Sequence, residues 1–328
     1  MTSVRVAIVG ATGETGSSIV DGLLESPTTK FEVTALARPE SLEKPAYTEL
    51  KNRGVKVVSA DLKGSQDALV SLLSGIDVVI SAIFFGSLED EIPLADAAKR
   101  AGVKRFLQSA FMVKEDILNY IQKIRLPYTY IDAGWWYQLT LPRLPSGRLD
   151  HALPSYPSEP RLGVDGNVPS ALADIRDVGR YVARVIADPR TLNKRVHVYN
   201  EVLTRNQVYD TVEKLSGEKL ERNYVCLPIL PYHRPFLLIT EAEVTSRIKE
   251  AQSGLVADPS SLDALSRLST SQLLLSWAIR GDNTPEYAKY LGYLDGKELY
   301  PDFKFTKFED YVKAALEGTA KGVYQKGK

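Results

Sequence analysis

The sequence is poor in the residues that form disulfides and metal sites. Its 328 residues include a single cysteine, Cys226, which has no partner for an internal disulfide and lies in an apolar stretch. We interpret Cys226 as structural and expect a reducing, cytoplasmic location. The histidines lie far apart and show no metal-ligand spacing, so we expect no metal; they are His151, His197 and His233.

The chain also lacks an excess of charge of either sign. Lysine and arginine together number 41, as do aspartate and glutamate, so the formal net charge is 0. This balance gives no reason to expect nucleic acid or an anionic membrane as a partner. No apolar run approaches the roughly 20 residues of a membrane span. A strand predicted directly after the N-terminus leads us to expect no secretory signal.

The clearest pattern is a strand that runs into a glycine turn. β-branched residues between Val4 and Val9 predict a buried parallel strand, and apolar positions within residues 17–24 predict a helix. Glycines at every third position lie between them, and such a turn lets backbone approach a pyrophosphate. An ordinary strand–helix turn is the alternative. The cofactor contacts expected here are Gly10, Thr12, Gly13, Glu14, Thr15 and Gly16.

The next predicted strand, residues 31–38, favours NADP(H) over NAD(H). An NAD site expects an acidic residue about 20 positions past the glycines, to hold the ribose 2′-hydroxyl. Here the strand ends at Arg38, with Lys44 and Arg53 nearby. A guanidinium at this place suits a 2′-phosphate, so we assign Arg38 and Lys44 to the cofactor site. A solvated basic loop is the alternative.

Strands and helices then alternate, which predicts a Rossmann-type α/β fold with a doubly wound parallel sheet. The further strands are expected at 56–61, 77–83, 103–109 and 128–132, and helices at 66–73, 91–101 and 115–123. Ligands bind beyond the carboxyl ends of such strands. We therefore add four residues at strand ends to the cofactor site: Asp61, Ser81, Ala82 and Ser109.

The alternation breaks after residue 132, which indicates a second region. We predict a cofactor-binding domain over residues 1–132, with 166–200 returning to it, and a smaller, mostly helical substrate-binding region over 133–165 and 201–328. Aromatic side chains just past strand ends would form a flat apolar slot. Core packing is the alternative for each of them. The expected substrate contacts are Phe84, Phe85, Phe111, Trp135, Trp136, Tyr137 and His233.

Several segments together resemble one family. GATGETG at 10–16, AGVKRFLQSAF at 101–111 and LPYTY at 126–130 are similar to NmrA-like proteins, and more narrowly to the isoflavone reductase and phenylcoumaran benzylic ether reductase group of atypical short-chain dehydrogenases. Further matching segments extend almost to the C-terminus. GWWYQ at 134–138 followed by LPSG at 144–147 resembles the fungal branch of that group.

The resemblance implies a catalytic lysine at the start of the helix that precedes the proline–tyrosine strand. In this sequence that position is Lys114. The family's Pro-Ser-Glu-Phe-Gly motif is changed here to QSAFM, and two residues separate Phe111 from Lys114. The Tyr-x-x-x-Lys spacing of ordinary short-chain dehydrogenases occurs at Tyr47 and Lys51, far from the expected nicotinamide end.

These observations predict an NADPH-dependent reductase that transfers a hydride to a small aromatic or polycyclic metabolite. The acceptor is a carbonyl, an activated double bond or a quinone-methide-like carbon, and Lys114 supplies or relays the proton. The alternative is a redox-sensing regulator that binds NADP without turnover. We expect a monomer or a homodimer.

Overall fold

The computed structural model of this protein describes residues 3–83, 85–110, 115–155, 165–222 and 241–325. The chain divides into two compact units, one of residues 1–133, 173–199 and 291–305, the other of residues 134–172, 200–290 and 306–328. The first unit is therefore built from three separate segments of the chain. Its third segment, residues 291–305, was not part of the predicted cofactor domain.

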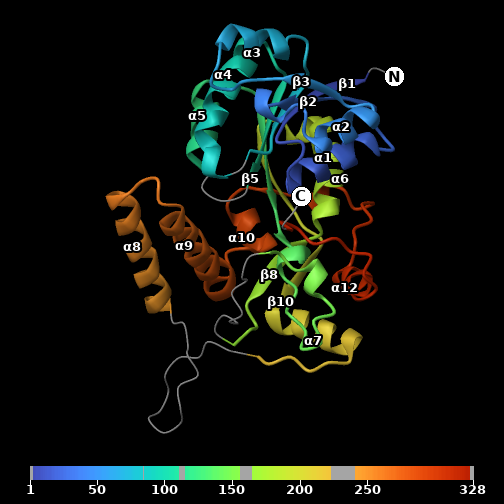
Figure 1. The fold of residues 1–328 in the computed structure, drawn as a ribbon, viewed down its shortest axis with the longest axis vertical. Coiled ribbons are helices and arrows are strands. Elements are labelled where there is room, and N and C mark those ends of the chain that lie inside the picture. The colour runs from blue at the N-terminus through green and yellow to red at the C-terminus, as the bar shows by residue number, and fades with distance from the viewer. Residues whose placement is uncertain (1–2, 84, 111–114, 156–164, 223–240, 326–328) are drawn as a thin grey trace. The chain divides into compact units, whose positions relative to one another are not determined.

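An eight-stranded parallel sheet forms the centre of the first unit, in the order β11-β9-β6-β5-β4-β1-β2-β3 (Figure 1). The order changes direction between β1 and β4, which is the switch point of a doubly wound sheet. The predicted fold class is confirmed. The strands are β1 (Val4–Val9), β2 (Phe31–Ala37), β3 (Lys56–Ser59), β4 (Val78–Ser81), β5 (Arg105–Ala110), β6 (Tyr128–Ala133), β9 (Lys194–Val198) and β11 (Leu294–Asp295).

Helices cover both faces of this sheet. One hydrophobic cluster joins the strands to α1 (Glu14–Leu24), α2 (Pro45–Asn52) and α6 (Ile175–Ala187). A second cluster joins the opposite face to α3 (Gln66–Leu73), α4 (Glu91–Arg100) and α5 (Glu115–Lys123). The short helix α11 (Gly296–Leu299) follows β11. Both faces are buried, so the strands read as nearly continuous apolar runs.

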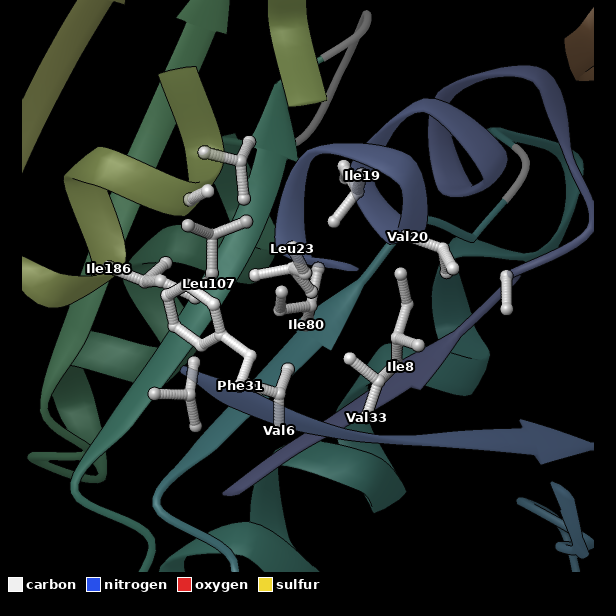
Figure 2. Packing of buried hydrophobic residues seen from close by; sticks show 14 of the residues in the cluster. Val6, Ile8, Ile19, Val20, Leu23, Phe31, Val33, Ile80, Leu107 and Ile186 are labelled. Atoms are coloured by element: carbon white, nitrogen blue, oxygen red, sulfur yellow. The ribbon is translucent and has the colours of Figure 1, made fainter. Parts of the chain in front are cut away.

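The packing of the first cluster explains the pattern of β-branched residues in the sequence. In Figure 2, Ile19 and Leu23 of α1 lie over the strands that carry Val6 and Ile80, and all four side chains are at most 2% exposed. Successive side chains of a strand point to opposite faces. Ala7 therefore belongs to the second cluster, whereas its neighbours Val6 and Ile8 belong to the first.

The second unit contains a small sheet as well as the helices that the sequence predicts. Its strands, in the order β10-β8-β7, are short, and Pro169 opens the middle one, which explains why the sequence analysis did not find them. The elements are β7 (Trp135–Trp136), β8 (Pro169–Ala173), β10 (Glu201–Thr204), α7 (Arg205–Ser216), α8 (Glu241–Ala257), α9 (Leu262–Leu273), a π-helix at Leu274–Arg280, α10 (Pro285–Tyr290) and α12 (Phe308–Leu316).

Two glycines bring α1 and α6 into backbone contact. A Cβ on Gly179 would lie 1.7 Å from the carbonyl oxygen of Ser18, and one on Gly22 would lie 2.2 Å from the carbonyl carbon of Gly179. The Ser18 hydroxyl accepts a hydrogen bond from the Gly179 N–H at 3.0 Å and donates one to the carbonyl of Ile175. The two helices can approach this closely only because neither glycine carries a side chain.

We expect Gly179→Ala to lower the free energy of unfolding by about 3 kcal/mol, because the added methyl group forces the two helices apart. Urea unfolding measures this change. Gly254→Ala in α8 is the matched control: its Cβ would meet only the Ala264 side chain, at 3.2 Å. Better helix propensity should leave that variant as stable as the original or more so, by up to about 1 kcal/mol. Equal destabilisation of both variants would contradict the contact argument.

Candidate functional site

In the turn between β1 and α1, the backbone lies close to the end of β4 and to the first turn of α1. Gly10 has a φ of +81°, and a Cβ there would lie 2.4 Å from the carbonyl oxygen of Ala82, just after β4. A Cβ on Gly16 would lie 1.9 Å from the carbonyl oxygen of Gly10. Any side chain at either position would displace backbone, so both glycines are needed to bring α1 against the turn.

Gly13 has a different environment from these two glycines. It is the N-cap of α1, its N–H donates to the carbonyl of Gly10 at 3.0 Å, and a Cβ on it would meet only that oxygen, at 3.4 Å. Gly13 has no side chain that could cap α1, and Thr12 and Gly13 are exposed, while Glu14 and Thr15 are half-buried. An uncapped helix N-terminus beside an open turn is suited to bind phosphate.

The basic residues predicted for the 2′-phosphate lie after β2. The Arg38 side chain is 73% exposed and pairs with Glu40 at 3.5 Å. Lys44 is exposed and is the N-cap of α2. Arg53 instead pairs with Asp21 of α1 at 2.7 Å. Exposed surface pairs are weak, so Arg38 can exchange Glu40 for a phosphate at little cost.

The other predicted cofactor residues differ in how they are placed. Asp61, just past β3, is exposed and accepts a hydrogen bond from the Lys63 N–H at 2.9 Å, which stabilises its own turn. Ser81 at the end of β4 is fully buried, and its hydroxyl has no hydrogen-bond partner among the described residues. Ala82 is half-buried, and its N–H donates to β1 at 3.0 Å. Ser109 lies in β5.

Three of the aromatic residues predicted to bind substrate, Trp135, Trp136 and Tyr137, lie in the second unit and are largely buried there. Tyr137 is 0% exposed, and its hydroxyl donates to the Glu201 carboxylate at 2.7 Å, so the core-packing alternative describes it. Trp136 is 3% exposed and stacks on Tyr324 with ring centroids 6.1 Å apart. Trp135 is half-buried and stacks on Trp277 at 5.3 Å, which leaves part of its surface for a ligand.

Several predicted site residues lie outside the described part of the chain. Phe85 begins a short helical segment that runs to residue 90, and only its backbone is described. The assignment of these residues therefore stays a prediction. Those outside the described ranges are Phe84, Phe111, Lys114 and His233.

The structure also reveals two titratable residues that the sequence analysis did not select. Asp132 is partly buried near the carboxyl end of β6, and burial raises the pKa of its carboxyl group to about 7. His197 lies beside it in β9, is 2% exposed, and burial lowers its pKa to about 4. A polar residue at the end of a predicted parallel strand was the available signal for Asp132.

Two other searches of the described residues gave no candidate. No helix among them is long and apolar enough to cross a membrane. Within the same ranges, no group of three or more histidine, cysteine, aspartate or glutamate side chains could hold a metal ion.

Comparison with known proteins decides the family. The sequence matches the NmrA-like family over residues 2–312. The chain belongs to the NmrA-like family. The resemblance found in the sequence is thus confirmed, and it covers nearly the whole chain.

Several relatives of this NmrA-like protein are named as dehydrogenases or reductases. It is 54% identical over 329 residues to asnovolin J 5′,6′-dehydrogenase nvfM of Aspergillus novofumigatus, with 96% of each chain covered. It is 28% identical to phenylcoumaran benzylic ether reductase TP7 of Nicotiana tabacum, covering 94% of this chain and 97% of the relative. The crystal structure of an isoflavone reductase has a TM-score of 0.71 at 26% identity, covering 95% and 99% of the two chains.

The pKa values of Asp132 and His197 affect the stability of this NmrA-like protein in opposite directions. Unfolded aspartate and histidine have pKa values of about 3.9 and 6.5. Between these values, folded Asp132 keeps a proton that the unfolded chain has lost, so its contribution lowers stability as pH rises. Folded His197 lacks a proton that the unfolded chain carries, so its contribution raises stability over nearly the same range.

We therefore expect each single variant to uncover the contribution of the other residue. In Asp132→Asn, stability should rise from about pH 4 to pH 6.5 by about 3 kcal/mol more than in the original protein. In His197→Gln it should fall over the same range. Urea unfolding at a series of pH values measures both slopes. Three parallel profiles would show that neither group has a shifted pKa.

Proposed function

We propose that this chain is an NADPH-dependent reductase that transfers a hydride to a small aromatic or polycyclic metabolite. The observation that carries the proposal is the open turn at Gly13, next to the uncapped N-terminus of α1, with the exposed cation Arg38 after the next strand. A helix N-terminus after the first strand suits the pyrophosphate of NADP(H), and a guanidinium after the second strand suits its 2′-phosphate.

The residues present fit NADP(H). The N–H groups at the start of α1 would hold the pyrophosphate, and Arg38 and Lys44 would hold the 2′-phosphate. Gly13 agrees with this assignment, because a Cβ there would meet only the Gly10 carbonyl oxygen, at 3.4 Å, and the turn is open to a phosphate. The bound cofactor supplies the hydride at its nicotinamide ring.

Lys114 is our candidate for handling the proton that accompanies hydride transfer. It follows β5 in the sequence, and the carboxyl ends of the parallel strands are where ligands of this fold bind. An ammonium group there would supply or relay the proton, or polarise the oxygen that gains charge.

The names of the relatives favour one of the three acceptors. The fungal relative is named a dehydrogenase acting at a 5′,6′ position, and phenylcoumaran benzylic ether reductase is named for a reduction. A site that makes or reduces a carbon–carbon double bond agrees with the first name, so we favour an activated double bond as the acceptor. The same residues serve both directions of such a reaction.

An absorbance assay tests this function. NADPH oxidation is followed with a panel of aromatic ketones, enones and quinones, and NADP⁺ reduction with the corresponding saturated ketones. We expect turnover with the conjugated double bonds. Tight binding of NADPH with no turnover on any member would instead support the redox-sensing regulator.

Cofactor choice should depend on Arg38. Arg38→Asp replaces a phosphate-binding cation with an anion, so NADPH affinity should fall by about 1.5–3 kcal/mol, the range for a hydrogen bond to a charged group. NADH affinity should be kept, and it serves as the internal control. Fluorescence titration with both cofactors measures the two values. Unchanged NADPH affinity would rule out this position for the 2′-phosphate.

Turnover should depend on Lys114. Lys114→Met keeps the length and the apolar stem but removes the ammonium group, so turnover should fall about 10²- to 10⁴-fold, while NADPH affinity changes little. Lys123→Met is the matched control, since Lys123 is exposed in the last turn of α5. If Lys114 is only a solvated lysine, neither variant should lose turnover. Near-original turnover of Lys114→Met would overturn the catalytic role of Lys114.

A further inference from the structure

Asp132 occupies a place in the sheet where a ligand is expected. In the strand register it lies beside Ala110 of β5 and His197 of β9. All strands of this sheet are parallel, so the end of β6 lies at the same edge as the glycine turn after β1 and the ends of β4 and β5. In doubly wound folds the ligand crevice is at this edge.

No cation among the described residues pairs with the Asp132 carboxyl group. Its carboxyl group makes no hydrogen bond or ion pair with the residues that the structure describes, and desolvation alone accounts for its raised pKa. Two strand positions earlier, Tyr130 packs edge to face on Tyr293, with ring centroids 6.3 Å apart. The Arg195 guanidinium lies 5.8 and 5.7 Å from these two rings, but it pairs with Glu115 at 2.5 Å. The Arg195 cation is therefore paired with Glu115 rather than with Asp132.

The neighbour of Asp132 on β9 is also uncharged at neutral pH. His197 is 2% exposed and stacks on Tyr199 with centroids 5.3 Å apart, and burial lowers its pKa to about 4. Asp295, the other charged group near this histidine, accepts hydrogen bonds from the N–H of Lys297 at 2.7 Å and from the Tyr199 hydroxyl at 3.1 Å. The described groups around Asp132 thus favour a protonated carboxyl group that can change its charge near neutral pH.

We propose that Asp132 is a second catalytic residue of this site, whose protonated carboxyl group donates its proton to the substrate oxygen during reduction. The proposal rests on the reductase function proposed above and assigns the proton to a different residue.

The proton passes from Asp132 to the substrate oxygen as the substrate is reduced. As the acceptor carbon of a conjugated ketone gains a hydride, the electron pair of its double bond moves through the conjugated system to the oxygen. The O–H bond of Asp132 breaks while a new O–H bond forms on that oxygen, and the resulting enol returns to the ketone. The Asp132 carboxylate then regains a proton from water. In the dehydrogenation direction, the same carboxylate accepts the proton.

A first test needs neither substrate nor cofactor. Infrared difference spectra of the full-length protein over a pH series report the carbonyl band of protonated carboxyl groups. We expect a carboxyl group that titrates near pH 7. It should be absent in Asp132→Asn and present in the control Asp67→Asn, whose side chain is 85% exposed on α3. An unchanged titration in Asp132→Asn would overturn the proposal.

A second test uses turnover on a substrate found with the assay panel. Asp132→Asn should lower kcat about 10²- to 10⁴-fold and remove the pH limb near neutrality, while KM for NADPH changes little. Asp132→Glu keeps an acid and should recover part of the rate together with a shifted limb. Asp67→Asn should behave as the original protein. An Asp132→Asn enzyme that keeps both its kcat and its pH limb would overturn the catalytic role.

The two tests separate this proposal from the reductase function. If NADPH fails to bind, the reductase function is wrong, and the infrared titration still reports on Asp132. If NADPH binds and is turned over but Asp132→Asn keeps full activity, only the role of Asp132 is wrong. Circular dichroism of each variant checks the fold, and Asp132→Glu provides the answer if Asp132→Asn does not fold.

Discussion

The position of helix α1 depends on backbone contacts at two points along its length. Near its start, Gly16 lies against the carbonyl of Gly10, and near its end, Gly22 lies against Gly179 of α6. A helix fixed at two points has a fixed axis, so the direction of its N–H groups and of its dipole is also fixed. Because α1 cannot shift, the open space at Gly13 keeps a fixed position relative to the N–H groups of the helix.

The sequence predicted the architecture of the first unit well, because strong local signals agreed there. β-branched runs, a glycine turn and amphipathic segments all indicated the same alternation. It did not predict β8 or β11. The first opens with Pro169 and the second is only two residues long, so neither shows a hydrophobic period. The pairing of Leu294 with Val196, and of β10 with β8, is a long-range contact that no local pattern encodes.

The glycine turn of the candidate site was easier to predict from the sequence than the environments of single buried side chains. Gly10 and Gly16 are required by backbone geometry, and the spacing of the glycines was enough to find them. Tyr137 and Asp132 were harder, because their roles depend on burial. The first is enclosed in the core of its unit, and burial raises the pKa of the second. Burial of a single side chain comes from the whole fold around it and leaves little trace in the adjacent sequence.

The two outer strands of the large sheet have a consequence for the behaviour of this protein in solution. A sheet edge with free backbone groups can add a strand from another molecule. Here one edge is the two-residue β11, which passes directly into α11, and the other is the four-residue β3, which begins with the exposed Lys56. Both edges are too short or too polar to template aggregation. Any association between copies of the first unit would therefore involve side-chain surfaces rather than extension of this sheet.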